Sequence, residues 1–136
     1  MSNNSSRSWG LAVLRVVAGT VFLMHGQQKL FHFGLHGVSG MLGSLGIPLP
    51  VFFAVVLTAV EFLGGIALIL GIATRLAAAL LAIDMIVAIL KVHLKNGFFA
   101  PTGVELPLTL LAAVLCLALS GAGAASVDGL FGKKTT

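Results

Sequence analysis

The first hydrophobic segment of the chain, Leu14 to Phe31, constrains the fold more than any other stretch. A helix through a bilayer takes roughly 20 apolar residues, and this segment is long enough, yet it contains Arg15, His25 and Lys29. A charged side chain near the middle of a bilayer costs about 2.5–3.5 kcal/mol, so such residues usually face a partner or a wet cavity. On a helix these three positions fall along roughly one stripe. We therefore expect this helix to turn a polar face toward the interior of a helical bundle.

Composition places the chain among membrane proteins. Of its 136 residues 58% are hydrophobic and 9% are charged, whereas soluble domains carry about 25% charged residues. The formal charge is +4, but the Lys and Arg residues are scattered rather than clustered with aromatics, so we expect no nucleic-acid partner. The single cysteine cannot form an internal disulfide, and no glycine motif for a dinucleotide follows a predicted strand. Any redox chemistry would need a bound cofactor or a partner chain.

Four apolar segments are each long enough to be read as a membrane-spanning helix. We expect these helices at residues 9–31, 49–70, 76–94 and 105–120. The last of them opens with an acidic residue and a proline in its first turn, both of which suit a helix start. The sequence therefore predicts an all-α fold, an integral membrane four-helix bundle formed as one domain by residues 9–120.

Three further segments lie outside the predicted spans. Residues 1–8 are polar and expected to be disordered, and residues 121–136 are expected to form an amphiphilic tail. The glycine-rich connection 33–48 has apolar residues at positions i, i+3, i+4 and i+7, which predicts a short one-sided helix at the membrane interface in the first outer loop. These apolar residues are Val38, Met41, Leu42 and Leu45.

Charge asymmetry predicts the orientation. Four spans put both termini on one side of the membrane, together with Arg7, Arg75, Lys133 and Lys134, whereas the opposite loops carry Lys95. Because cytoplasmic loops carry the excess of Lys and Arg, both termini are expected in the cytoplasm.

An inner layer of charges is predicted from depth along the helices. At 1.5 Å per residue, Arg15 lies roughly 9 Å from the cytoplasmic end of its span, and Glu61 and Asp84 each lie roughly 14 Å from theirs. We therefore expect Arg15 to meet both carboxylates in an intramembrane ion cluster. Two close carboxylates rarely both ionise in a dry site, so one of them is expected to hold a proton. The plain alternative is an ion pair that only specifies how the helices assemble.

An outer layer of polar residues is the candidate binding site. Its five members come from three spans and leave a positive surplus; they are His25, Lys29, Lys91, His93 and Glu105. A single histidine here would usually be a satisfied interfacial residue, but five ionisable groups exceed what packing needs. They predict a pocket for a quinone head-group or a small anion. Axial ligation of a b-type haem by two histidines is the weaker alternative. No metal-ion site is predicted.

A series of motifs in order along nearly the whole chain carries a family resemblance. They are LRVVAG and HGQQKLF in the first span, SLGIP before the second, then EFLGGIALILGIATR, VHLKNGFF, Glu105 at the start of the last span and SGAGAASVDGL. The chain resembles the DoxX family of small bacterial membrane proteins, and within it the CatD-like oxidoreductase branch. The motif positions that carry over are Arg15, His25, Gly26, Lys29, Glu61, Arg75, His93, Asn96, Gly97 and Glu105. Asp84 and Lys91 have no place in the family pattern.

The resemblance implies a four-helix protein of the bacterial inner membrane, linked to redox defence or to thiol, sulfur and quinone metabolism. In a related branch, DoxD, the protein is a subunit of a thiosulfate:quinone oxidoreductase. Three functional hypotheses follow. The chain is a redox-associated membrane subunit that holds a quinone or a small sulfur anion, or a small-molecule carrier, or a scaffold that docks a soluble or peripheral redox enzyme. Assembly of several copies is compatible with each of them.

Overall fold

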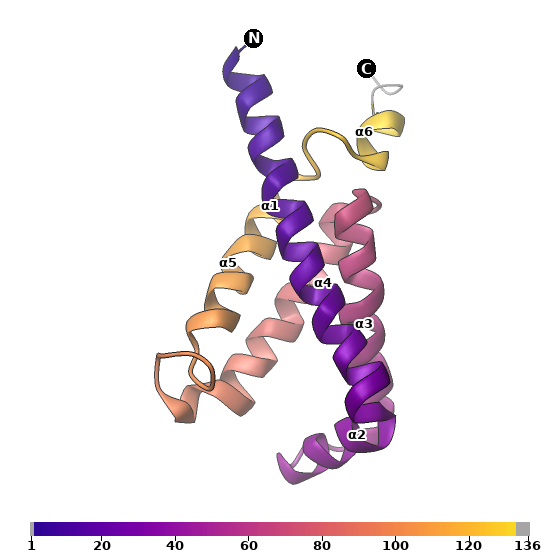
Figure 1. Ribbon diagram of the computed structural model, residues 1–136, viewed down its shortest axis with the longest axis vertical. Helices are drawn as coiled ribbons and strands as arrows, with labels where there is room; N and C mark the ends of the chain where they lie inside the picture. The colour runs from indigo at the N-terminus through magenta and orange to yellow at the C-terminus, as the bar shows by residue number, and fades with distance from the viewer. Residues whose placement is uncertain (1, 133–136) are drawn as a thin grey trace.

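The computed structural model describes residues 2–132, and all regular structure within them is helical (Figure 1). The fold class predicted from the sequence, an all-α membrane bundle, is confirmed. The elements in chain order are α1 (Ser2–Gln27), the π-helical turn η1 (Gln28–Phe33), α2 (Gly34–Ser44), α3 (Pro50–Leu70), α4 (Thr74–Ala88), the π-helical turn η2 (Ile89–His93), the 3₁₀ turn η3 (Leu94–Asn96), α5 (Glu105–Ser120) and α6 (Val127–Gly132).

Three helical stretches are long and apolar enough to cross a membrane, and α5 is a shorter apolar helix of 16 residues. Large hydrophobic side chains are exposed along the outside of all four helices, as a lipid-facing surface requires. The first helix begins earlier than expected. The prediction that the polar residues 1–8 are disordered is wrong from Ser2 onward, because α1 begins at Ser2.

The four long helices close into a ring. α1 packs mainly on α3, α3 on α4 and α4 on α5, while α5 also touches α1. The short helix α2 packs across α3 at the end of the bundle opposite to the start of α1 and to α6 (Figure 1). The expected short helix after the first span is thus present. The centre of the bundle is filled by side chains at most 1% exposed, namely Phe22, Leu68, Leu81, Val114 and Leu117.

Glycines set how closely α1 and α3 approach. A methyl group at Gly26 would lie 2.5 Å from the backbone nitrogen of Phe62, and one at Gly65 would lie 2.5 Å from that of Leu23. Such distances leave no room for any side chain, so the two backbones touch at these points, as small residues permit in membrane helices. This contact fixes the register between the two helices, and with it the partners of every polar residue on them.

Arg15 closes the end of the bundle at which α6 lies. Its side chain is fully buried, and its guanidinium donates five hydrogen bonds of 2.8–3.0 Å to backbone carbonyls. Two acceptors end α3 and three belong to the loop before α6; they are the carbonyls of Leu68, Ile69, Ala122, Ala124 and Ala125. The predicted meeting of Arg15 with Glu61 and Asp84 is therefore wrong. The last carbonyls of a helix have no intrahelical partner, and a planar group with five donors satisfies them.

The C-terminal segment is tied to the α3–α4 turn as well. The carboxylate of Asp128 accepts hydrogen bonds of 2.8 Å from the backbone amides of Ala73 and Thr74, which open α4. In return the amide of Asp128 donates to the carbonyl of Gly71. The expected amphiphilic tail therefore begins with a docked helix, whereas Lys133 and Lys134, which entered the predicted charge count, lie outside the described residues.

Candidate functional site

A cavity of about 490 Å³ lies between the helix pair α1–α3 and the helix pair α4–α5, at the end of the bundle where α2 packs. Most of its wall is apolar and comes from α2, α4 and α5, with Phe22 of α1 at its floor. Six ionisable residues line it, and all were singled out from the sequence: His25, Lys29, Glu61, Asp84, Lys91 and His93. The structure thus merges most of the two predicted layers into one site, and it moves Arg15 out of that site altogether.

Lys29 and Glu61 form the ion pair at the α1–α3 side of this cavity. The distance between Lys29 Nζ and Glu61 Oε1 is 2.9 Å, and the two side chains are 16% and 4% exposed. The pair follows from the close contact of Gly26 with Phe62, because Lys29 lies about one turn beyond Gly26 and Glu61 directly precedes Phe62. Glu61 therefore has a cationic partner on α1, but it is Lys29 instead of the predicted Arg15.

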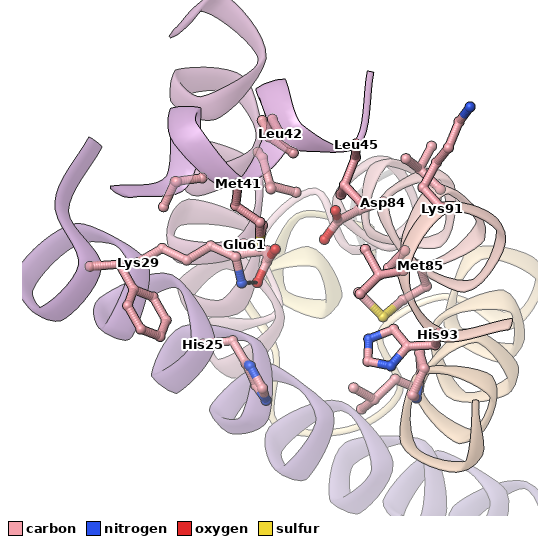
Figure 2. Close-up of a pocket in the computed structure, with 18 of the residues that line it drawn as sticks. His25, Lys29, Met41, Leu42, Leu45, Glu61, Asp84, Met85, Lys91 and His93 are labelled. Atoms are coloured by element: carbon pink, nitrogen blue, oxygen red, sulfur yellow. Dashed lines mark hydrogen bonds and ion pairs between the residues drawn. The ribbon is translucent and has the colours of Figure 1, made fainter. Parts of the chain in front are cut away.

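Asp84 faces this ion pair from α4. Figure 2 shows its carboxyl group pointing toward Glu61 across the cavity. The residue is 8% exposed, and its Oδ2 atom is buried without a hydrogen-bond partner among the described residues. A buried polar atom left unpaired costs about 1–3 kcal/mol, so this atom calls for a partner such as a bound ligand or water. The predicted proximity of Glu61 and Asp84 agrees with this arrangement.

Two π-helical turns carry three of the four basic residues of the site. Lys29 belongs to η1, whereas Lys91 and His93 belong to η2. Single π-helical turns are rare inside helices and frequently occur at functional sites. In Figure 2 the imidazole of His93 reaches toward the cavity, while the ammonium of Lys91 points away from the two carboxyl groups. Lys91 is exposed and lies at the edge of the site.

His93 is held in one orientation by the loop before α5. Its Nδ1 atom lies 2.9 Å from the carbonyl oxygen of Thr102, which also accepts a 3.3 Å hydrogen bond from the side chain of Asn96. A carbonyl oxygen can only accept, so Nδ1 carries the proton. The other ring nitrogen, Nε2, then has a free lone pair. His93 can accept a proton or a hydrogen bond there.

Glu105 is the one member of the predicted outer layer that does not line the cavity. Its carboxylate accepts a 2.8 Å hydrogen bond from the backbone amide of Ala100 and so folds the loop back onto the start of α5. Two carboxyl groups that were predicted for the inner layer take its place beside the basic residues. Within the lining, Lys29 and Lys91 are matched by Glu61 and Asp84, because helix register brings both carboxyl groups into this layer.

The contribution of α2 to the wall of the cavity was not predicted from the sequence. The four apolar residues whose spacing predicted a one-sided interfacial helix all line the cavity; they are Val38, Met41, Leu42 and Leu45. The periodicity was the right signal, but a helical pattern does not tell whether its apolar face meets lipid or a cavity. Among the described residues, no group of three or more His, Cys, Asp or Glu side chains is arranged to hold a metal ion.

Comparison with known proteins agrees with this architecture. Residues 10–94 match the model of the family described as DoxX. The chain is 37% identical over 125 residues to a Bacillus subtilis protein named "Putative oxidoreductase CatD", covering 92% of this chain and 89% of that protein. It is 36% identical over 132 residues to an uncharacterized Haemophilus influenzae protein, with 94% and 95% covered. It is also 34% identical over 134 residues to "Uncharacterized membrane protein Rv3486" of Mycobacterium tuberculosis, with 90% and 82% covered. No solved structure matches the chain.

Proposed function

The chain belongs to the DoxX family, and from that premise we propose that it is a redox-associated membrane subunit whose cavity binds a quinone head-group. The observation that carries this proposal is the buried Oδ2 atom of Asp84, which has no hydrogen-bond partner among the described residues and faces a 490 Å³ cavity. A quinone carbonyl or quinol hydroxyl is a partner of the right size and polarity. The name of the Bacillus subtilis relative, which contains the word oxidoreductase, points in the same direction.

The charge balance of the lining favours a neutral ligand. Lys29 is neutralised by Glu61 at 2.9 Å, and Asp84 adds a further carboxyl group beside them. A sulfur anion would meet no unpaired cation there, because the ammonium of Lys29 is already paired with Glu61 and that of Lys91 points away from the two carboxyl groups. An uncharged ring in a mostly apolar wall needs no such cation.

The polar residues can handle the protons that quinone chemistry requires. A quinone becomes a quinol by gaining two electrons and two protons, one proton at each carbonyl oxygen. One ammonium neutralises one carboxylate, so the carboxyl group of Asp84 is the one that can hold a proton, and His93 Nε2 can accept one. The proposal assigns the electrons to a soluble or peripheral redox enzyme docked on the bundle.

The carrier hypothesis has less support. A permeation pathway would have to continue past the cavity toward the end of the bundle where Arg15 lies. That region is filled by Phe22, Leu68, Leu81 and Leu117, all at most 1% exposed. The carrier would nevertheless be favoured if a substrate accumulated in proteoliposomes without an electron acceptor. The scaffold would be favoured if redox function were lost only when docking surfaces are changed.

Quinone retention tests the proposal. The full chain is purified from its native membrane in mild detergent, and bound quinone is measured by mass spectrometry per mole of protein. We expect retention in the wild type, and its loss in Asp84→Asn and in Lys29→Met. Lys95→Ala is the matched control, because Lys95 is an exposed cation outside the cavity lining.

Three outcomes contradict the proposal. They are equal quinone content in the wild type and both cavity variants, a bound sulfur anion in place of quinone, and a haem absorbance band that requires His25 and His93. The yield of each variant, measured alongside, separates loss of ligand from loss of folded protein.

A further inference from the structure

His25 lines two separate hollows of the molecule. One is the ligand cavity, and the other is a hollow of about 320 Å³ on the outside of α1 and η1. The outer hollow is lined, besides His25, by Met24, Gln27, Gln28 and His32. Among the residues that the structure describes, no other ionisable side chain lines both. Within this part of the chain, the half-buried imidazole of His25 is therefore the titratable group that connects the two spaces.

The two spaces differ in the groups that can exchange a proton with His25. On the cavity side, the ionisable groups are the Lys29–Glu61 pair, Asp84, Lys91 and His93. On the outer side, His32 and two glutamines are exposed. Polar side chains in such number at the end of a membrane helix are placed to meet interfacial water instead of hydrocarbon. His25 thus stands between a proton-consuming site and a source of protons.

Among the described residues, the other ionisable groups of the cavity line no second polar hollow of this kind; Lys91 is exposed at the edge of the site, but its ammonium points away from the two carboxyl groups. Toward the end where Arg15 lies, the bundle is packed with apolar side chains such as Phe22 and Leu81. On the opposite side, His93 Nδ1 donates to the carbonyl of Thr102, and an amide carbonyl cannot pass a proton onward. The wall formed by α2, the loop after it and α5 is largely apolar, with Leu45 and Leu106 among its residues. It suits a lipid-dissolved ligand better than a proton.

We propose that His25 carries protons between the outer hollow and the ligand cavity. The inference rests on the proposed quinone function for its purpose, but its geometry does not depend on the ligand. In the step, one ring nitrogen gains a proton from water in the hollow, and the other nitrogen gives its proton to the cavity carboxyl groups. One N–H bond forms and one breaks, so a single proton crosses and a neutral imidazole remains.

Hydrogen–deuterium exchange of the Asp84 carboxyl group tests this route without any need for turnover. Full-length protein in proteoliposomes is mixed rapidly with D₂O, and infrared spectroscopy follows the protonated-carboxyl band that is missing in Asp84→Asn. We expect exchange about tenfold slower or more in His25→Phe, which fills the space and removes the titratable group. His36→Phe is the matched control, because His36 is an exposed histidine that lines neither hollow. His25→Gln serves if His25→Phe does not fold.

The outcomes separate the route from the ligand. Slow exchange in the His25 variants, with exchange as fast as in the wild type in His36→Phe, supports the proposal whether or not quinone is retained. Exchange as fast as in the wild type overturns it, and if quinone is lost at the same time, His25 is a ligand contact. Absence of an Asp84 carboxyl band in the wild type also overturns the route, whereas quinone retention still decides the proposed function by itself.

Discussion

At the scale of single residues, the pairing of Lys29 with Glu61 is the contact on which the site depends. Glu61 is 3% exposed, and its partner is held 2.9 Å away. Removing one member of a buried pair leaves an uncompensated charge and typically costs about 3–5 kcal/mol. We therefore expect Glu61→Ala to lower the yield of folded protein and its melting temperature in detergent.

The double variant Lys29→Met with Glu61→Leu checks that prediction. Replacing both members of a buried pair with apolar residues is often neutral for stability, so this variant should recover much of the loss while binding no quinone. If the double variant lost as much stability as the two single variants added together, the interaction between Lys29 and Glu61 would not stabilise the protein.

At the scale of an element, α4 begins without a side-chain cap of its own, and Asp128 from the C-terminal segment takes that role. Burial alone would raise the pKa of Asp128, but hydrogen bonds from Thr74 and Ala73 and the charge of Arg15 lower it below its ordinary value. We expect Asp128→Ala to cost about 0.5–2 kcal/mol at neutral pH, the usual cost of losing a cap.

The cap also predicts a pH dependence. Because the pKa of Asp128 is lower in the folded protein than in the unfolded chain, its stabilisation is fully present above the unfolded value of about 4. It is lost as the pH falls through the folded value. The melting temperatures of the wild type and Asp128→Ala should therefore converge on acidification below about pH 4. A constant difference across that range would contradict the capping role.

At the scale of the whole molecule, the orientation in the membrane is a prediction. Arg7 and Arg75 lie near the end of the bundle that carries α6, so both termini are expected in the cytoplasm of a bacterial inner membrane. In a Cys116→Ser background, Gly40→Cys in α2 should react with an impermeant thiol reagent in intact cells. Ser5→Cys should react only after permeabilisation. A methyl group at Gly40 meets no neighbouring atom within 4 Å, so the first substitution is sterically harmless. The reverse labelling pattern would invert the topology.

The sequence by itself determined the class of fold, the four apolar helices and the short helix after the first span, and it singled out the six ionisable residues that line the cavity, although it also counted Glu105 among them. These follow from local properties, because hydropathy, period and helix-end residues act within one segment. The start of α1 was placed too late, since a polar helical turn carries no hydropathic signal.

Only the tertiary structure decided which of these residues meet. Arg15 was matched to Glu61 by counting depth along separate helices, but the register between α1 and α3 is set by contacts at Gly26 and Gly65. In that register Glu61 forms its ion pair with Lys29, and Asp84 lines the same cavity. Arg15 is satisfied by five backbone carbonyls instead. Every residue has a carbonyl, so no pattern of side chains marks which ones a fold will leave free for a buried guanidinium.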